Sequence, residues 1–184
     1  MPATPRPGGP ARPPGDGPPL VYITFGTVFT EDLTHLKTLV DGVRELPVRV
    51  LATVGPNGDP AALGDQPEHV EVASFIPQAQ TLPRCAAVVS HGGSGTFLAA
   101  LAHGLPQLLV PQAADQFLNA AGAERSGTGL ALRDGELTAG AVRGAVQQLL
   151  DDDAIASAAE RGAAEIAAMP SPAAVAELLA ERYG

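Results

Sequence analysis

Cysteine and aromatic residues are the scarcest components of this 184-residue chain. Its one cysteine, Cys85, excludes a disulfide within the chain and any cysteine-built zinc site. Tryptophan is absent, and five Phe with two Tyr are too few to provide the stacking platforms that single-stranded nucleic acids use. The apolar runs, such as residues 97–102, are short, whereas a membrane-spanning helix needs about 20 apolar residues. These absences leave an aliphatic core of Ala, Leu and Val as the means of folding.

Positive charge is scarce as well. Eleven Lys and Arg against 20 Asp and Glu give a formal net charge of −9. Residues 1–19 hold Arg6, Arg12 and Asp16, a net +1, so residues 20–184 carry −10. A domain this acidic lacks the electrostatic footprint of a nucleic-acid binder and is repelled by anionic membranes. The N-terminus also lacks the apolar stretch of a signal peptide. We therefore expect a cytoplasmic protein that has neither nucleic acid nor membrane as a partner.

Proline and glycine set residues 1–19 apart from the rest. Eight Pro and four Gly occur there, a composition typical of a disordered linker or tail. The chain as a whole is 45% hydrophobic and 17% charged, which excludes intrinsic disorder for the remainder. Residues 20–184 are enough for one α/β domain.

Short apolar runs alternate with helical patterns along residues 20–184. Thr30 and Thr138 are placed to cap two of the helices, and Asp153 a third. Such alternation predicts parallel βαβ units and a doubly wound, Rossmann-like parallel sheet, with ligands bound beyond the carboxyl ends of its strands. The expected strands are 20–25, 48–54, 70–75, 87–90, 107–110 and 129–132, and the expected helices are 30–46, 94–103, 115–125, 138–150, 154–168 and 172–183.

The most informative stretch is a glycine-rich turn between an expected strand and an expected helix. It comprises residues 91–96, His-Gly-Gly-Ser-Gly-Thr. The first N–H groups of a helix have no partner within the helix, and the dipole adds about half a positive charge there. Glycines let an anion approach the backbone, and Ser94 and Thr96 add hydroxyl groups. The turn therefore predicts a phosphate site built without lysine.

Two further motifs flank this turn. Phe75-Ile76-Pro77-Gln78 precedes it, and a Pro-x-x-x-Asp-Gln motif at residues 111–116 follows it. The three motifs, in this order, resemble the C-terminal half of family 1 glycosyltransferases of the GT-B fold. The likeness is greatest to bacterial enzymes that glycosylate natural products, and it extends over nearly everything from Leu20 onward.

The resemblance assigns residues to the binding of a nucleotide-sugar donor. It implies that His91 contacts the diphosphate and stabilises it as the leaving group, and that Phe75 and Ile76 pack on the nucleobase, with Gln78 at the same edge. Asp115 and Gln116 would bind hydroxyls of the sugar. From the residues alone plainer roles stay open: Asp115 as a helix N-cap, Phe75 as a core residue, and Pro77 and His91 as turn residues. The implied phosphate-binding residues are Gly26 and Thr27 in a loop over the phosphates and Gly92, Gly93, Ser94, Gly95 and Thr96 in the turn.

One departure from the family bears on the choice of donor. Many members have a glutamate that binds the ribose hydroxyls at the position of Ala99. An alanine offers no acceptor for a 2′-hydroxyl, which favours a dTDP-sugar over a UDP-sugar. No metal site and no tightly bound cofactor are expected, and Asp151–Asp153 is better explained by helix capping than by metal binding.

The resemblance also implies a missing half. In the family the acceptor pocket and the catalytic base lie in an N-terminal domain, so transfer would need that domain in cis or in trans. We expect the chain alone to bind the donor and to be inactive in transfer. Two alternatives stay open, a stand-alone nucleotide-sugar-binding or regulatory module, and half of a GT-B fold sugar-nucleotide epimerase.

Overall fold

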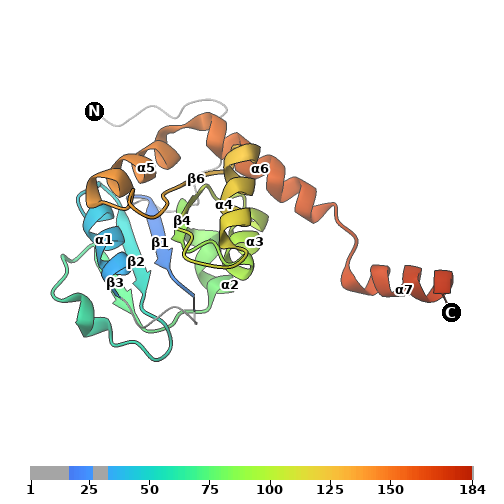
Figure 1. The fold of residues 1–184 in the computed structure, drawn as a ribbon, viewed down its shortest axis with the longest axis horizontal. Coiled ribbons are helices and arrows are strands. Elements are labelled where there is room, and N and C mark those ends of the chain that lie inside the picture. The colour runs from blue at the N-terminus through green and yellow to red at the C-terminus, as the bar shows by residue number, and fades with distance from the viewer. Residues whose placement is uncertain (1–16, 27–32, 184) are drawn as a thin grey trace.

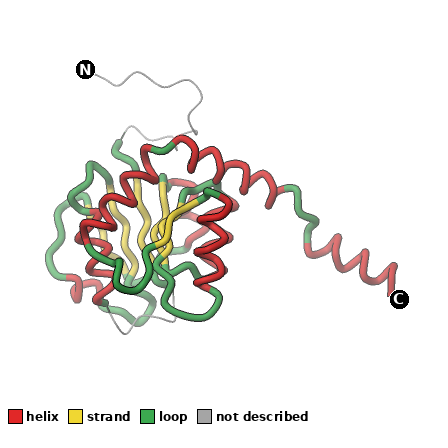
Figure 2. Tube along the Cα trace, turned by 45° about the horizontal axis from the view of Figure 1, so that its top comes forward, coloured by secondary structure: helices red, strands yellow, loops and turns green. Residues whose placement is uncertain are grey.

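A six-stranded parallel sheet forms the centre of the molecule (Figures 1 and 2). The computed structural model describes residues 17–26 and 33–183. The strand order is β3-β2-β1-β4-β5-β6, so the direction of winding reverses between β1 and β4. The strands are β1 (Leu20–Thr24), β2 (Arg49–Thr53), β3 (Val70–Ala73), β4 (Ala87–Ser90), β5 (Gln107–Leu109) and β6 (Gly129–Ala131).

Helices follow most of the strands and cover both faces of the sheet. Two short 3-10 helices, η1 (Pro60–Leu63) and η2 (Leu82–Arg84), lie in the connections on either side of β3. The α-helices are α1 (Thr34–Val43), α2 (Gln78–Thr81), α3 (Ser94–Ala102), α4 (Gln116–Ser126), α5 (Ala139–Asp151), α6 (Asp153–Ala167) and α7 (Pro172–Tyr183).

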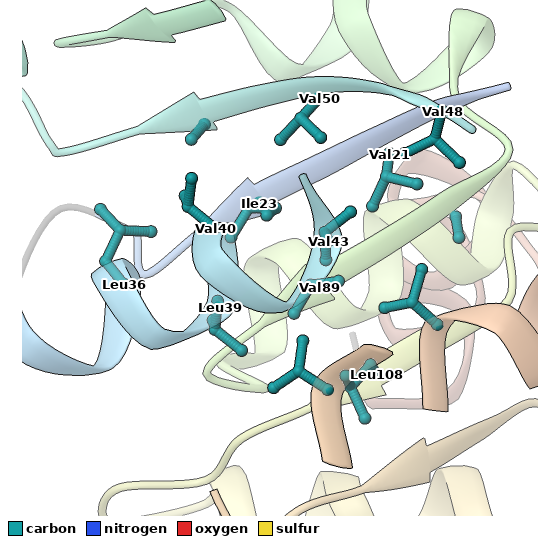
Figure 3. Packing of buried hydrophobic residues seen from close by; sticks show 14 of the residues in the cluster. Val21, Ile23, Leu36, Leu39, Val40, Val43, Val48, Val50, Val89 and Leu108 are labelled. Atoms are coloured by element: carbon teal, nitrogen blue, oxygen red, sulfur yellow. The ribbon is translucent and has the colours of Figure 1, made fainter. Parts of the chain in front are cut away.

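The main core lies between the sheet and the helices α1 and α5, which pack against each other. Alternate residues of a strand point to opposite faces, so Val21 and Ile23 face this core. Figure 3 shows these side chains gathered against Leu39 and Val40 of α1, all fully buried. The second face carries a smaller aliphatic cluster that includes Tyr22 and is covered by α2, η2 and α3. Burial on both faces explains the continuous apolar strands.

The doubly wound parallel sheet predicted from the sequence is confirmed. Each strand lies within its expected range, and the turn-rich stretch after β2 contains only η1. Thr138 caps α5 as expected, with its Oγ1 accepting from the N–H of Ala141 at 3.1 Å. Residues 1–16, most of the expected tail, and Thr30 lie outside the described residues.

One expected cap is wrong. Asp152, and not Asp153, is the N-cap of α6, because its Oδ1 accepts from the N–H of Ala154 at 2.9 Å. Asp153 is the first helical residue instead, where its negative charge favours the positive end of the helix dipole.

Cys85 is a small buried residue of the core. Its Sγ donates to the carbonyl of Thr81 at 3.3 Å, and its side chain belongs to the second aliphatic cluster. Burial raises the pKa of this thiol to about 12, with a smaller opposing effect from the charge of Arg84. The thiolate required for reaction is therefore scarce in the native protein.

The C-terminal helix α7 extends away from the domain in both views (Figures 1 and 2). It has no buried residue, and Val175, Leu178 and Leu179 are 39%, 59% and 53% exposed. Within the described ranges no single helix is long and apolar enough to cross a membrane, and α6 with α7 passes that test only as a pair bent by 45°.

The contact between α1 and α5 depends on Gly42, and this generates a prediction. A Cβ on Gly42 would lie 2.7 Å from both the carbonyl oxygen of Ala139 and the Cβ of Val142. We expect Gly42→Ala to separate the helices and to lower the free energy of unfolding by about 1–3 kcal/mol in urea denaturation.

Gly144 of α5 provides the matched control, because a Cβ there would meet nothing within 4 Å. Gly144→Ala should raise the free energy of unfolding by up to about 1 kcal/mol, since alanine is the better helix former. Equal effects of the two substitutions would contradict the packing argument.

Candidate functional site

The candidate site lies where the sheet reverses its winding, beyond the carboxyl ends of β1 and β4. These strands pair in parallel, with Thr24 opposite Ser90. Each strand ends in the same local turn. The N–H of Gly26 donates to Thr24 Oγ1, and the N–H of Gly92 donates to Ser90 Oγ, both at 3.1 Å. Hydroxyl side chains stabilise such turns by accepting from the N–H two residues on. The two turns bring Gly26 next to His91.

The His91 imidazole lies between two glycines. A Cβ on Gly26 would be 2.9 Å from the ring Cε1, and a Cβ on Gly93 would be 2.4 Å from Nε2. Phe25 stacks against the ring with centroids 6.1 Å apart. Only 9% of His91 is exposed. Glycine at both positions is therefore required for the ring to occupy this place.

Burial lowers the pKa of His91 from its ordinary value of 6.5. A hydrogen bond with the backbone of Thr24 and the charge of Asp115 act in the opposite direction, more weakly. The imidazole is therefore neutral at pH 7, and an anion bound beside it would favour its protonation.

The turn after His91 leads into the N-terminus of α3. Gly92 has a φ of +83°, a left-handed conformation that favours glycine. Gly93 is the N-cap and has no side chain with which to cap the first N–H groups of the helix. Gly95, in the first turn, is exposed and faces open space. Within this turn Gly92 is buried and Gly93 is partly exposed, so Gly95 is the glycine that a ligand could approach most freely.

Asp115 lies opposite this helix N-terminus, at the start of α4. It occupies the N-cap position but makes no capping hydrogen bond. Its Oδ2 instead accepts from Ser94 Oγ at 2.6 Å. This hydrogen bond lowers the pKa of Asp115 more than any other contact does. Asp115 therefore presents an exposed, charged carboxylate beside the glycine-rich turn.

Gln116 has a structural contact that the sequence did not indicate. It is buried, and its Oε1 accepts from the N–H groups of Gln112 and Ala113 at 2.7 and 3.0 Å. These bonds stabilise a loop in which Ala114 has a left-handed φ of 53°, a conformation that costs a non-glycine residue about 1 kcal/mol. Its oxygen is occupied in this structure, so Asp115 is the available acceptor of the pair.

Asn119 is a site residue that the sequence analysis missed. Its Nδ2 donates to the carbonyl of Gly92 at 2.8 Å and to Ser94 Oγ at 3.1 Å. One sequence feature could have indicated it. Asn119 follows Asp115 by four residues, a spacing that places both side chains on the same side of a helix at its start.

Phe75 and Gln78 lie on the other side of α3. Phe75 is 61% exposed, which excludes the plainer role of a core residue. Ile76 is half-buried against the second aliphatic cluster. Gln78 Nε2 donates to Thr96 Oγ1 at 3.0 Å and so links this segment to the first turn of α3. Thr27 lies outside the described residues.

Two of the other histidines make contacts. His35 stacks on Phe25 with centroids 6.4 Å apart, on a ring that also contacts His91. The His69 ring hydrogen-bonds the carbonyl of Arg44 at 2.9 Å. His103 is exposed.

Comparison with known families identifies this arrangement. A family model described as the C-terminal domain of proteins like erythromycin biosynthesis protein CIII matches residues 37–182. The chain belongs to this family. Its sheet, flanking helices and glycine-rich turn are thus those of the C-terminal half of a GT-B glycosyltransferase, which confirms the resemblance read from the three motifs.

Relatives of this chain are named as glycosyltransferases or as transferases of particular sugars. The demethyllactenocin mycarosyltransferase of Streptomyces fradiae is 33% identical over 90% of this chain. The glycosyltransferase SnogD from Streptomyces nogalater is 32% identical over 94% of the chain, with a TM-score of 0.79. The glycosyltransferase VinC, solved in complex with dTDP, is 34% identical over 89%, with a TM-score of 0.77. This chain spans 36%, 46% and 42% of their respective lengths, less than half in each case.

The position of His91 between glycines can be tested by substitution. Because a Cβ on Gly93 would be 2.4 Å from Nε2, Gly93→Ala should displace the imidazole toward water. We expect the pKa of His91, measured by an NMR titration of its ring protons, to rise toward 6.5.

Gly95→Ala is the matched control, since a Cβ there would meet nothing within 4 Å. It should leave the pKa of His91 unchanged. The geometry would be refuted by a Gly93→Ala protein whose His91 titrates as in the parent chain.

Proposed function

We propose that this chain is the donor-binding domain of an inverting glycosyltransferase that uses a nucleotide-sugar, with a small natural-product molecule as the acceptor. The observation that carries the proposal is the placement of His91, buried between Gly26 and Gly93 beside the N-terminus of α3. The family membership and the glycosyltransferase names of the relatives support it.

The diphosphate would bind at the turn formed by residues 91–96. The free N–H groups and dipole of α3 supply positive potential there, which a domain with so few basic residues needs locally. His91 would contribute an N–H donor and, with an anion beside it, a positive charge. As the bond between the sugar and the diphosphate breaks, negative charge grows on the leaving group, so donors aimed at it lower the barrier.

The nucleobase would lie on Phe75, whose exposure leaves its ring available for stacking. Ile76 supports this segment from the core side. The hydrogen bond between Gln78 and Thr96 holds the base-binding segment against the phosphate-binding helix. One rigid unit would therefore position both ends of the nucleotide.

The sugar would be held by Asp115, whose charged carboxylate is an acceptor for hydroxyl groups. Gln116 would contribute mainly by shaping the loop, because its oxygen is occupied by two backbone N–H groups.

Transfer would require a second domain, in cis or in trans, that binds the acceptor and supplies a base. The acceptor oxygen would attack the anomeric carbon while the base takes the hydroxyl proton. The bond to the diphosphate breaks as the new one forms, which inverts the configuration and releases the nucleoside diphosphate. In that complete enzyme, His91 stabilises the leaving group.

The donor is proposed to be a dTDP-sugar. Ala99 is half-buried on α3 against the second aliphatic cluster and offers no acceptor for a ribose 2′-hydroxyl. The complex of VinC with dTDP is consistent with this preference.

The protonation of His91 predicts a pH dependence of binding. Its pKa lies below 6.5 in the free protein, and a bound diphosphate raises it, so binding takes up protons. Affinity for dTDP should increase by about three- to tenfold from about pH 8 to pH 6, equivalent to a pKa shift of up to ~1 unit. Isothermal titration calorimetry in two buffers of different ionisation enthalpy measures the proton uptake.

His91→Gln is the matched control, because glutamine keeps an N–H donor but does not titrate. The titration of dTDP itself is common to both proteins, so the difference between their pH profiles reports His91. Identical profiles would remove His91 from the diphosphate site.

The preference for a deoxyribose can be tested with three nucleotides. Comparison of dUDP with UDP isolates the 2′-hydroxyl, and comparison of dTDP with dUDP isolates the 5-methyl group. We expect dUDP to bind about two- to tenfold more tightly than UDP, the effect of one unsatisfied hydrogen bond. Ala99→Glu should reduce this ratio, and a parent chain that binds UDP more tightly than dUDP would overturn the preference.

A further inference from the structure

Three side chains join the phosphate-binding turn to the proposed sugar acceptor. Asn119 Nδ2 lies 3.1 Å from Ser94 Oγ, and Ser94 Oγ lies 2.6 Å from Asp115 Oδ2. Ser94 is the second residue after Gly92 and begins α3, whereas Asp115 and Asn119 lie at the start of α4. The hydrogen-bond chain thus connects the start of α3 to the start of α4.

The direction of the hydrogen-bond chain is determined by chemistry. Asn119 Nδ2 also faces the carbonyl oxygen of Gly92 at 2.8 Å, which identifies this atom as the amide nitrogen, because a carbonyl only accepts. An amide nitrogen only donates, so Ser94 Oγ accepts from Asn119. A charged carboxylate only accepts, so Ser94 gives its single hydroxyl proton to Asp115.

A serine hydroxyl has one proton, and this one is already used. While the bond to Asp115 persists, Ser94 Oγ cannot also donate to a phosphate oxygen. Ser94 Oγ therefore differs from the first N–H groups of α3, which have no acceptor within the helix.

We propose that Asn119 and Ser94 are positioning residues that orient the Asp115 carboxylate toward a hydroxyl of the donor sugar, and that the Ser94 side chain acts on sugar binding rather than on diphosphate binding. This inference rests on the proposed function, since it assigns residues of the same donor site to the sugar or to the diphosphate of the ligand.

The physical advantage lies in preorganisation. Asp115 is exposed, so without a partner its side chain would rotate among rotamers and lose entropy on binding. The hydrogen bond from Ser94 removes that freedom before the sugar arrives. Ser94 is also the largest cause of the lowered pKa of Asp115, with smaller contributions from Asn119 and His91. The hydrogen bond from Ser94 thus favours the charged form of Asp115.

The test compares two ligands, dTDP and dTDP-glucose, by calorimetry on the purified chain and its variants. In Ser94→Ala, affinity for dTDP should stay within about twofold, and affinity for dTDP-glucose should fall about five- to tenfold, the net effect of one typical hydrogen bond. Asn119→Ala should produce the same pattern to a smaller extent. Ser94→Thr, which keeps the hydroxyl, should restore the parent affinities.

A double-mutant cycle checks that the effect passes through Asp115. In the Asp115→Asn background, Ser94→Ala should change the affinity for dTDP-glucose by the same factor as the affinity for dTDP. A ligand-free readout follows the carboxyl carbon of Asp115 by NMR. The pKa of Asp115 should rise in Ser94→Ala and in Asn119→Ala.

Each other outcome has a definite meaning. Equal weakening of both ligands in Ser94→Ala would assign the hydroxyl to the diphosphate and overturn the inference while preserving the proposed function. No effect on either ligand, or an unchanged pKa of Asp115, would also overturn it. If the parent chain binds neither dTDP nor dTDP-glucose, the proposed function fails and this inference with it.

Discussion

The parallel pairing of β1 with β4 is the constraint on which the candidate site depends. It places Thr24 opposite Ser90, and each strand then turns through a hydroxyl-stabilised bend into glycine. The two bends leave a space that the His91 ring fills, with glycine on either side. The sheet reverses its winding at this pair, and such a switch point is where open α/β sheets bind ligands.

The electrostatics of the site follow from the same arrangement. A domain with a net charge near −10 would repel a nucleoside diphosphate at most places on its surface. The N-terminus of α3 supplies local positive potential through backbone groups, which require no basic side chain. His91 is held neutral by burial and is ready to gain a proton when an anion binds. Asp115 lies at the far side of the turn, where its carboxylate accepts from Ser94, which in turn accepts from Asn119.

Much of the fold and part of the site could be predicted from the sequence, for identifiable reasons. Continuous apolar runs such as Val21 and Ile23 in β1 predict strands buried on both faces, and the predicted sheet is confirmed. The glycine-rich turn predicted a strand-to-helix junction, and α3 begins there. The cap of α6 was misplaced by one residue, because Asp152 and Asp153 have the same capping chemistry and differ only in backbone conformation.

The sequence by itself determined the order of the strands and of the longer helices, the aliphatic core and the position of the glycine-rich turn, because these depend on local pattern and on residue chemistry. The tertiary structure decided which polar groups are available. It directs Gln116 Oε1 into its own loop, leaves Asp115 exposed and brings Asn119 to Gly92, 27 positions away in the chain. Hydrogen-bond partners are chosen by distance and direction between separate segments, and spacing along one segment does not contain that information.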